Sequence, residues 1–346
     1  MIELRTLTDG GQTPDSVAAE LASFLDGAER SLDIAIYDVK LEGPPEQAVL
    51  GALVAARDRG VTVRLAFNSD HPGWMHGPPP PATDPDLLAA LPIETRAIPG
   101  VPDLMHHKYV VRDGTTVWTG SMNWTLDSWT REENVIVRVA SEAIAASYTA
   151  DFEQLWLRGS VEASGAVSPT EVQVGGIPVR AWFCPRRGLK LAHRIANAIG
   201  HAERRIRIAS PVITSGPILG SLCEVAADGQ VDVAGVVDIT QIEEVFRQWA
   251  GRPGAGEWKT HALKSLLRTA PFSGKRSTPY TPTSVHDYMH AKLTVCDDTV
   301  FVGSFNLSHS GERNAENVLE LEDAAIADRL AAFVDEVRAR YPAVSL

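Results

Sequence analysis

Hydrophobic and polar residues alternate in four short segments of the chain, and these segments form two similar pairs. AERSLDIAIYDV (28–39) and AERRIRIASPVI (202–213) each follow a helix-like stretch. Each is followed by another helix-like stretch and a second strand-like run, VTVRLAFN (61–68) or VDVAGVVD (231–238). Alternation with a period of two is typical of strands. The order helix, strand, helix, strand therefore occurs twice, which indicates an internal repeat.

Each copy closes with an amphipathic, helix-like segment, SEAIAASYTADFEQLW (141–156) in the first and DAAIADRLAAFVDEV (323–337) in the second. Strands that alternate with helices predict α/β architecture on a parallel or mixed sheet. We therefore expect an α/β fold made of two similar α/β/α halves with largely mixed β-sheets.

The segment between the copies, RGSVEASGAVSPTEVQVGGIP (158–178), is rich in Gly, Ser, Ala and Pro and has no sustained helical period. Such composition predicts a linker. We place the first half at 1–160, the linker at 161–178 and the second half at 179–346.

A second irregular segment, DHPGWMHGPPPPATDPD (70–86), interrupts the first half with proline and glycine. It predicts a long loop, and its length suggests a rim over a site. His71 and His76 within it have a spacing that could hold a metal, but no third ligand is evident, so we predict no metal site.

Length and composition bound the class of protein. The 346 residues are enough for about two domains, and 44% hydrophobic with 22% charged residues is typical of a soluble globular chain. The N-terminus does not resemble an export signal, and no segment approaches the ~20 apolar residues of a membrane span. The three cysteines, Cys184, Cys223 and Cys296, are widely spaced and lack CxxC pairing, so we expect a reducing cytoplasm.

The net charge of −12 disfavours a protein that coats nucleic acid through a general basic surface. One stretch, 252–276, is nevertheless basic. It is equally consistent with a solvated surface loop and with a substrate-binding rim. Its cations are Arg252, Lys259, Lys264, Arg268, Lys275 and Arg276.

The chemistry-bearing residues lie in two matching histidine segments, LMHHKYVVRDG (104–114) and YMHAKLTVCDD (288–298). Both contain Met-His-x-Lys and, four residues after the lysine, an aspartate. The pattern HxKxxxxD therefore occurs twice. Its members are His106, Lys108 and Asp113 in the first copy and His290, Lys292 and Asp297 in the second.

A second shared element, Gly-Ser-x-Asn, follows each aspartate, and Glu-Asn-Val begins ten residues beyond each of its asparagines, at Glu133 and Glu316. Turn-like RDGT (112–115) and CDDT (296–299) would return the chain as a hairpin and bring this element beside the histidine strand. The residues concerned are Ser121 and Asn123 in the first copy and Ser304 and Asn306 in the second.

Strand geometry separates the two adjacent histidines of the first copy. Residues i and i+2 of a strand face the same side, so His106 and Lys108 project together. His107 points the other way and corresponds to Ala291 in the second copy. We therefore expect His107 to be a packed or surface histidine.

Two such halves docked about a pseudo-two-fold axis would form a single site able to cleave a phosphodiester. Fixed cations and hydrogen-bond donors stabilise the charge that grows on phosphoryl oxygens. One unprotonated histidine can attack phosphorus while the other gives a proton to the leaving alcohol. We expect Lys108, Lys292, Asn123 and Asn306 to bind the phosphoryl group, Ser121 and Ser304 to add donors, and Glu133 and Glu316 to hold the two rings.

These motifs resemble those of the phospholipase D superfamily, whose members carry HxKxxxxD followed by GSxN twice, and the resemblance covers nearly the whole chain. It implies a metal-independent, two-step reaction through a covalent phosphohistidine, without a cofactor. It also implies that His106 is the nucleophile and His290 the general acid, with Asp113 and Asp297 supporting the turns.

The substrate stays open within that family. We expect a phospholipid or a related small diester, cleaved with water or an alcohol as acceptor. The alternatives are an endonuclease acting on DNA or RNA and a phosphatidyltransferase of the cardiolipin-synthase type, although the membrane segments of the latter are lacking. A catalytically dead scaffold is disfavoured because both copies of the motif are complete. One chain holds both motifs, so we expect an active monomer without integral membrane contact.

Overall fold

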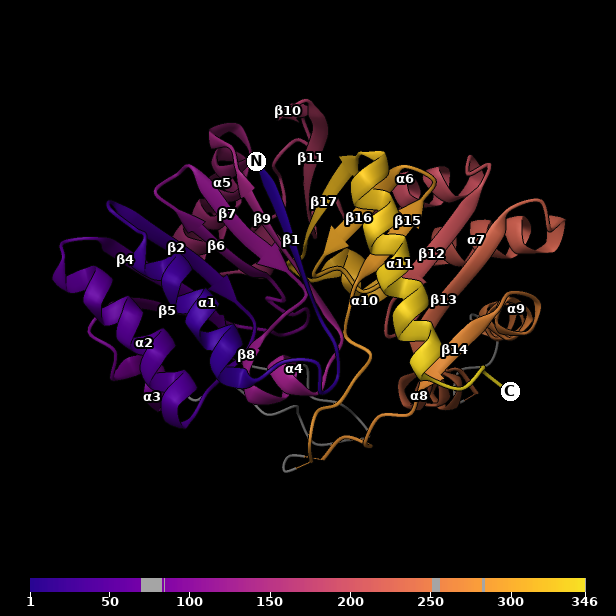
Figure 1. The fold of residues 1–346 in the computed structure, drawn as a ribbon, viewed down its shortest axis with the longest axis horizontal. Coiled ribbons are helices and arrows are strands. Elements are labelled where there is room, and N and C mark those ends of the chain that lie inside the picture. Colours follow the sequence, from indigo (N-terminus) through magenta and orange to yellow (C-terminus); the bar gives the residue numbers. More distant parts are fainter. Residues whose placement is uncertain (70–82, 84, 251–255, 282–283, 346) are drawn as a thin grey trace.

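The two halves of the chain lie side by side in the computed structural model, which describes residues 1–69, 83, 85–250, 256–281 and 284–345 (Figure 1). The elements of the first half are β1 (Ile2–Leu7), α1 (Pro14–Asp26), β2 (Ser31–Ile36), β3 (Val39–Lys40), α2 (Gly43–Asp58), β4 (Thr62–Asn68), α3 (Pro85–Ala89), β5 (Glu94–Ile98), β6 (Lys108–Arg112), β7 (Thr116–Gly120), β8 (Trp124–Thr125), α4 (Leu126–Thr130), β9 (Asn134–Ala140) and α5 (Glu142–Arg158).

The second half repeats this arrangement with a few additions. Its elements are η1 (Val161–Ala163), β10 (Val172–Val174), β11 (Ile177–Phe183), α6 (Gly188–Gly200), β12 (Arg205–Ala209), α7 (Gly216–Asp228), β13 (Asp232–Asp238), α8 (Ile239–Ala250), α9 (Glu257–Thr269), β14 (Phe272–Lys275), β15 (Leu293–Cys296), β16 (Thr299–Gly303), α10 (His309–Arg313), β17 (Asn317–Glu322) and α11 (Ala324–Arg340).

The strand orders show the internal duplication directly. In the described residues the first sheet has the order β1-β9-β7-β6-β2-β4-β5, and the second has β10-β11-β17-β16-β15-β12-β13-β14. Apart from β10, each strand of one sheet has a counterpart at the same place in the other. Both sheets are mixed, since β2 pairs parallel with β4 and antiparallel with β6, as β12 does with β13 and β15. The predicted α/β fold with two similar halves is confirmed.

The segment expected to be a linker contains regular structure near its end. β10 pairs antiparallel with β11, with Val174 opposite Ile177, so the second sheet begins before residue 179. A strand of three residues is too short to produce a visible alternation in the sequence. The irregular part of the connection therefore runs from the end of α5 to the start of β10, broken only by the short helix η1.

The segment 70–86, expected to form a rim over the site, lies almost wholly outside the described residues, and so do His71 and His76. Thr83 is described and buried, and its hydroxyl accepts a hydrogen bond from the Val39 amide at 3.1 Å. This part of the segment is thus tied to the chain just after β2.

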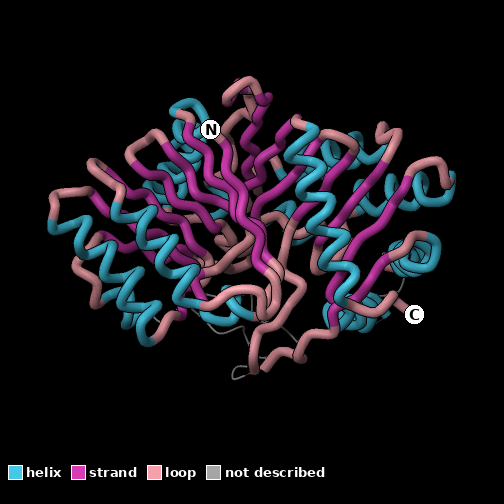
Figure 2. The backbone as a smooth tube through the Cα atoms, in the orientation of Figure 1, coloured by secondary structure: helices cyan, strands magenta, loops and turns pink. Residues whose placement is uncertain are grey.

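Helices flank the strands in both halves (Figure 2), and three apolar cores follow from their packing. One core joins α1 and α2 to the first sheet, and another joins α6, α7 and α9 to the second. The third lies between the halves and includes α5 and α11. In the described residues no helix is both long and apolar enough to cross a membrane.

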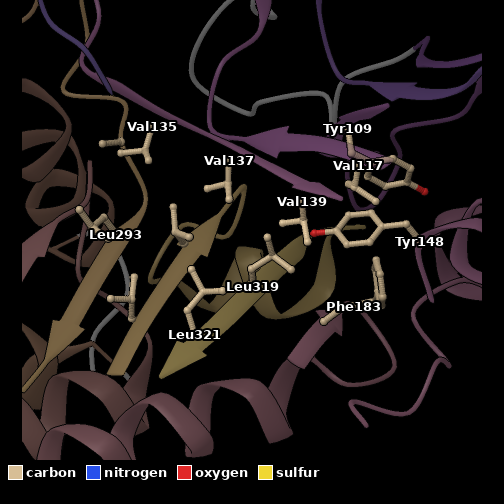
Figure 3. Close-up of a cluster of buried hydrophobic side chains, with 14 of the residues drawn as sticks. Tyr109, Val117, Val135, Val137, Val139, Tyr148, Phe183, Leu293, Leu319 and Leu321 are labelled. Carbon is tan, nitrogen blue, oxygen red and sulfur yellow. The ribbon is translucent and has the colours of Figure 1, made fainter. Parts of the chain in front are cut away.

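The core between the halves is built largely from β9 and β17. Val135, Val137 and Val139 of β9 face Leu319 and Leu321 of β17 (Figure 3), and all of these side chains are buried. β-branched and leucine side chains on facing sheets exclude water from the contact and supply its main driving force. This apolar contact fixes the two histidine strands, β6 and β15, relative to each other.

Candidate active site

The two His-x-Lys segments stand at the start of β6 and β15 and are buried. His106 and His290 are 6% and 9% exposed, and Lys108 and Lys292 are each 3% exposed. In each copy the lysine ammonium donates a hydrogen bond to the carbonyl of its own histidine, at 2.8 Å from Lys108 and 2.5 Å from Lys292. The structure therefore brings each histidine together with its own lysine, as the alternation of side chains along a strand predicted.

The ring of each histidine is held by the opposite half. The Nδ1 atom of His106 lies 2.8 Å from Oε1 and 2.9 Å from Oε2 of Glu316. The Nδ1 atom of His290 lies 3.0 Å from Oδ1 of Asn134 and 3.2 Å from Oε2 of Glu132. Because every one of these contacts crosses between the halves, each histidine is oriented only when the halves are docked.

The expectation that Glu133 holds His290 is corrected by the structure. Glu133 is fully buried, but its carboxylate accepts hydrogen bonds from Lys275 Nζ at 3.0 Å and from the Tyr341 hydroxyl. Sequence spacing selected the wrong glutamate because the first copy has one more residue than the second between its serine and the residue that this serine pairs with on the following strand, Val135 or Asn317. The neighbouring Glu132 was missed, although the doubled acid in REEN (131–134) gave a sign of it.

The Ser121 and Ser304 hydroxyls donate to the residues that hold the histidine rings, which corrects their predicted role as phosphate donors. The Ser121 hydroxyl donates to Asn134 Oδ1 at 2.7 Å, and the Ser304 hydroxyl donates to Glu316 Oε2 at 2.5 Å. Each hydroxyl also accepts a backbone N–H of the next strand, at 3.0 Å in both cases. A hydroxyl has one hydrogen to donate, and here it is already used.

Asn123 and Asn306 retain hydrogen-bonding capacity at the site. The Oδ1 atoms of both are buried and have no hydrogen-bond partner among the residues that the structure describes. Buried side-chain amides normally have partners, so an unpaired amide is a place where a ligand can bind. Donation to a phosphoryl oxygen would come from Nδ2, because an amide oxygen only accepts, and this predicted role of Asn123 and Asn306 stays a proposal.

Asp113 and Asp297 lie at the tips of the β6–β7 and β15–β16 hairpins. Both have positive φ, 57° and 53°, a conformation that aspartate tolerates better than most residues. The Asp113 carboxylate accepts backbone N–H groups of residues 29–31, and that of Asp297 accepts those of residues 203–205. Both therefore tie a hairpin to the start of a neighbouring strand, as expected of turn-supporting residues.

His107 faces away from the site and is fully buried between the halves. Its Nε2 atom lies 3.1 Å from the Asp151 carboxylate of α5, and its Nδ1 atom lies 3.3 Å from Oδ1 of Asn317. The ring also packs on Tyr109 and Phe183. Of the two adjacent histidines, only His106 reaches the site.

Tyr37 and Asp38, which follow β2, line the site beside His106, and no pattern in the sequence selects them. The Tyr37 ring packs edge-on against the imidazole of His106 with 4.8 Å between ring centres, and Lys108 Nζ lies 4.7 Å from the centre of the same ring. Burial raises the pKa of Asp38 to about 7, and the positive charge of Lys108 opposes that shift. The first half thus adds an aromatic ring and a carboxyl group to the site.

Burial sets the charge states of the central groups. It lowers the pKa of Lys108 to about 7 and raises the pKa of Glu316 and of Glu132 to about 7. The pKa of each histidine is lowered well below its ordinary value, first by burial and then by the charges of both lysines. The negative charge of a bound anion would favour the charged lysines, and it would also favour the charged histidines and so offset the lowering of their pKa. A neutral imidazole at His106 is the form that can act as a nucleophile.

The basic stretch 252–276 does not form a continuous free cationic surface in the described residues. Lys275 is buried against Glu133, Arg276 pairs with Glu243 at 2.9 Å, and Lys259 donates to the Thr214 carbonyl at 2.9 Å. Arg252 lies outside the described residues. In the described part of the chain, no cluster of three or more His, Cys, Asp or Glu side chains could hold a metal.

Comparison with known families agrees with the duplicated site. The sequence model of the family described as "Cardiolipin synthase, PLD-like domain" matches residues 21–156 and 195–338, one stretch in each half. The chain belongs to the phospholipase D superfamily. Both stretches contain an HxKxxxxD motif, so the family match and the two-half site coincide.

Among curated proteins, this phospholipase D superfamily chain is 30% identical to "Mitochondrial cardiolipin hydrolase" of Xenopus laevis over 145 residues, which are 41% of the chain and 62% of the relative. It is 25% identical to the protein of the same name from Chlamydomonas reinhardtii over 144 residues, 42% of the chain and 59% of the relative. The matches therefore span less than two thirds of the length of these relatives.

Two solved structures share the fold of this superfamily member over nearly its whole length. Phosphatidylserine synthase from Haemophilus influenzae Rd KW20 superposes with a TM-score of 0.66 at 10% identity, covering 98% of this chain and 86% of that one. Polyphosphate kinase from Porphyromonas gingivalis superposes with a TM-score of 0.63 at 12% identity, covering 96% and 46%. At these identities the likeness shows the fold alone.

Proposed function

We propose that this phospholipase D superfamily member cleaves or transfers a phosphodiester through a covalent phosphohistidine. The observation that carries the proposal is the pair His106 and His290, each buried beside its own lysine and each held at Nδ1 by the opposite half. Because Nδ1 is engaged in both rings, the chemistry falls to the Nε2 atoms.

In the first step the Nε2 atom of neutral His106 attacks phosphorus. A P–N bond forms, the P–O bond to the leaving alcohol breaks, and that oxygen takes a proton from Nε2 of protonated His290. In the second step His290 removes a proton from water or an alcohol, whose oxygen attacks phosphorus and breaks the P–N bond. Lys108, Lys292, Asn123 and Asn306 stabilise the charge on the phosphoryl oxygens in both steps.

A phospholipid or a related small diester is the substrate that we favour. The matching family description and the names of the curated relatives both refer to cardiolipin. Several cations of the stretch 252–276 are engaged in contacts within the protein, which weakens the case for an endonuclease that binds DNA or RNA there. A phosphatidyltransferase of the cardiolipin-synthase type differs only in using an alcohol as acceptor, and it stays an alternative.

We also propose that the protein acts as a monomer in the cytoplasm. A single chain supplies both histidines and both ring-holding groups, so the site is complete without a second copy. All three cysteines are free, as expected in a reducing compartment.

The direct test is incubation of the purified protein with cardiolipin vesicles, phosphatidylglycerol vesicles and single- and double-stranded DNA and RNA, all in the presence of EDTA. We expect release of phosphatidic acid or transfer to added glycerol, and a phosphohistidine peptide containing residue 106 in rapidly quenched samples. Cleavage of nucleic acid without any lipid turnover would favour the endonuclease. No turnover and no adduct with any diester would refute the proposed chemistry.

A further inference from the structure

In each half, two positions next to the site hold one glutamate and one asparagine, but the order of the two is opposite in the two halves. In the first half the sequence is Glu132-x-Asn134, and in the second it is Asn314-x-Glu316. Alignment by motif spacing conceals this relationship, because it places Glu133 opposite Glu316. The strand pairings reveal it.

The backbone register fixes the correspondence. Gly120 pairs with Ile136 between β7 and β9, and Gly303 pairs with Val318 between β16 and β17. The serine after each glycine donates its backbone N–H to the residue just before that partner, Val135 at 3.0 Å or Asn317 at 2.9 Å. Val135 and Asn317 therefore correspond. One residue before them, Asn134 is the counterpart of Glu316, and three residues before them, Glu132 is the counterpart of Asn314.

The side-chain contacts agree with this correspondence. The serine hydroxyl donates to Asn134 in one half and to Glu316 in the other, as described above. In each half the amide then donates to the carboxylate, Asn314 Nδ2 to Glu316 Oε1 at 3.2 Å and Asn134 Nδ2 to Glu132 Oε2 at 3.5 Å. Each histidine therefore meets one carboxylate, but the two carboxylates come from different positions in the two halves.

The orientation of the Asn134 amide follows from its other contacts. Its Nδ2 atom donates to the Ser128 carbonyl at 2.9 Å, and its Oδ1 atom accepts the Ser121 hydroxyl. Oδ1 therefore faces the His290 ring, and an amide oxygen can only accept. Nδ1 of His290 must carry the hydrogen, whatever the charge of Glu132.

We propose that Glu132 is the positioning carboxylate of His290 and that Asn134 fixes the hydrogen on its Nδ1 atom. This inference rests on the proposed function, in which His290 has to carry a proton on Nε2 at the start of the reaction. Glu132, 3% exposed and 3.2 Å from Nδ1, favours the protonated ring by its charge. Asn134 keeps the Nδ1 hydrogen in place when that charge is lost. At Nδ1, His106 meets the Glu316 carboxylate and, among the described residues, no side-chain amide oxygen.

The positive charges of Lys292, Lys275 and Lys108 act on Glu132 as well, and all three favour its ionised form. Lys292 belongs to the same His-x-Lys segment as His290, whereas Lys275 reaches Glu133 and the Arg131 carbonyl from β14. The segment that delivers Glu132 is therefore held from the second half on both sides of it.

The test removes and then relocates the glutamate of the first half. Glu132→Asn removes the carboxylate from His290, and the double variant Glu132→Asn/Asn134→Glu gives the first half the same residues as the second. We expect Glu132→Asn to lower kcat by about 10²-fold with little change in KM, because a poorly held acid weakens proton transfer. The double variant should recover to within about 10-fold of the wild type, as P–O cleavage again has a carboxylate-held acid.

Glu133→Gln is the matched control, because it removes the adjacent carboxylate, which does not touch the ring. We expect it to leave the kcat of the folded protein within about 3-fold of the wild type. A double variant no more active than Glu132→Asn, with a native circular dichroism spectrum, would overturn the inference.

A second readout does not depend on turnover. In protein labelled with ¹⁵N-histidine, the His290 signals, assigned by their loss in His290→Asn, should report hydrogen on Nδ1 in the wild type and a lower ring pKa in Glu132→Asn. An unchanged pKa would overturn the role of Glu132 even if activity fell. Absence of all diester turnover with the expected ring signals would instead refute the proposed function and leave the positioning role intact.

Discussion

The carboxylate of Glu316 contacts Nδ1 of His106 through both of its oxygens, at 2.8 and 2.9 Å, although the two residues lie 210 positions apart and in different halves. A carboxylate in this place keeps the hydrogen on Nδ1 and leaves Nε2 as the reactive atom. The reactive form of His106 therefore depends on docking of the second half.

Glu316→Gln should lower kcat by about 10²- to 10⁴-fold, because the amide can offer N–H to Nδ1 and so favour the wrong tautomer. The measurement is steady-state turnover of the best diester found. Glu322→Gln, on the same strand and partly exposed, should be indistinguishable from the wild type. An active Glu316→Gln variant would contradict the assignment.

Substitution of the two adjacent histidines should have opposite effects. His106→Asn should abolish the phosphohistidine adduct, whereas His107→Asn should keep the adduct but lower the free energy of unfolding by about 1–3 kcal/mol, since it removes a buried partner of Asp151. Rapid-quench adduct trapping and urea unfolding measure the two quantities. Adduct formation in His106→Asn but not in His107→Asn would reverse the assignment.

The buried pair of Lys275 and Glu133 joins the halves next to Glu132, with 3.0 Å between Nζ and Oε2. Lys275→Met should lower the free energy of unfolding by about 3–5 kcal/mol, because it leaves an uncompensated buried carboxylate. Arg276→Met, which breaks an exposed pair with Glu243, should cost at most about 1 kcal/mol. Equal losses in urea unfolding would show that burial does not distinguish the pairs.

Anion binding should weaken as the pH rises through about 7, because the pKa of Lys108 lies near that value and its ammonium is lost above it. Sulfate is a suitable probe, since it stays a dianion from pH 5 to 9 and its own charge does not change. Calorimetric titration should show this decline in the wild type and a shallower one in Lys108→Met. Lys264→Met on α9 is the control and should titrate as the wild type does.

Asp113 should stabilise the folded state at neutral pH and lose that effect in acid. Partial burial alone would raise its pKa, but backbone N–H groups of residues 29–31 outweigh burial and lower it. The contribution is therefore present above the ordinary carboxyl pKa and disappears as the pH falls through the lowered value. Asp113→Ala should cost about 1–3 kcal/mol in urea at pH 7 and less at pH 3, with kcat unchanged. A constant difference across this range would contradict the assignment.

The duplicated motifs predicted much of this architecture, because HxKxxxxD needs a strand and a hairpin to place its side chains. The ring contacts of His290 could not be predicted, since they join residues far apart in sequence and from different halves. The single extra residue between Ser121 and Val135 made Glu133 match in spacing while Glu132 matches in space. Likewise, Ser121 and Ser304 looked like phosphate donors until their hydrogen bonds were known.

The exchange of glutamate and asparagine between the halves has a consequence for how such a site can evolve. A protein that builds the same site from two identical subunits must place the same residue at both positions, so any change made for one histidine is imposed on the other. Fusion of the two copies into one chain removes that constraint. Selection can then act on each histidine separately, so that one keeps an unprotonated nitrogen for attack and the other delivers a proton to the departing alcohol.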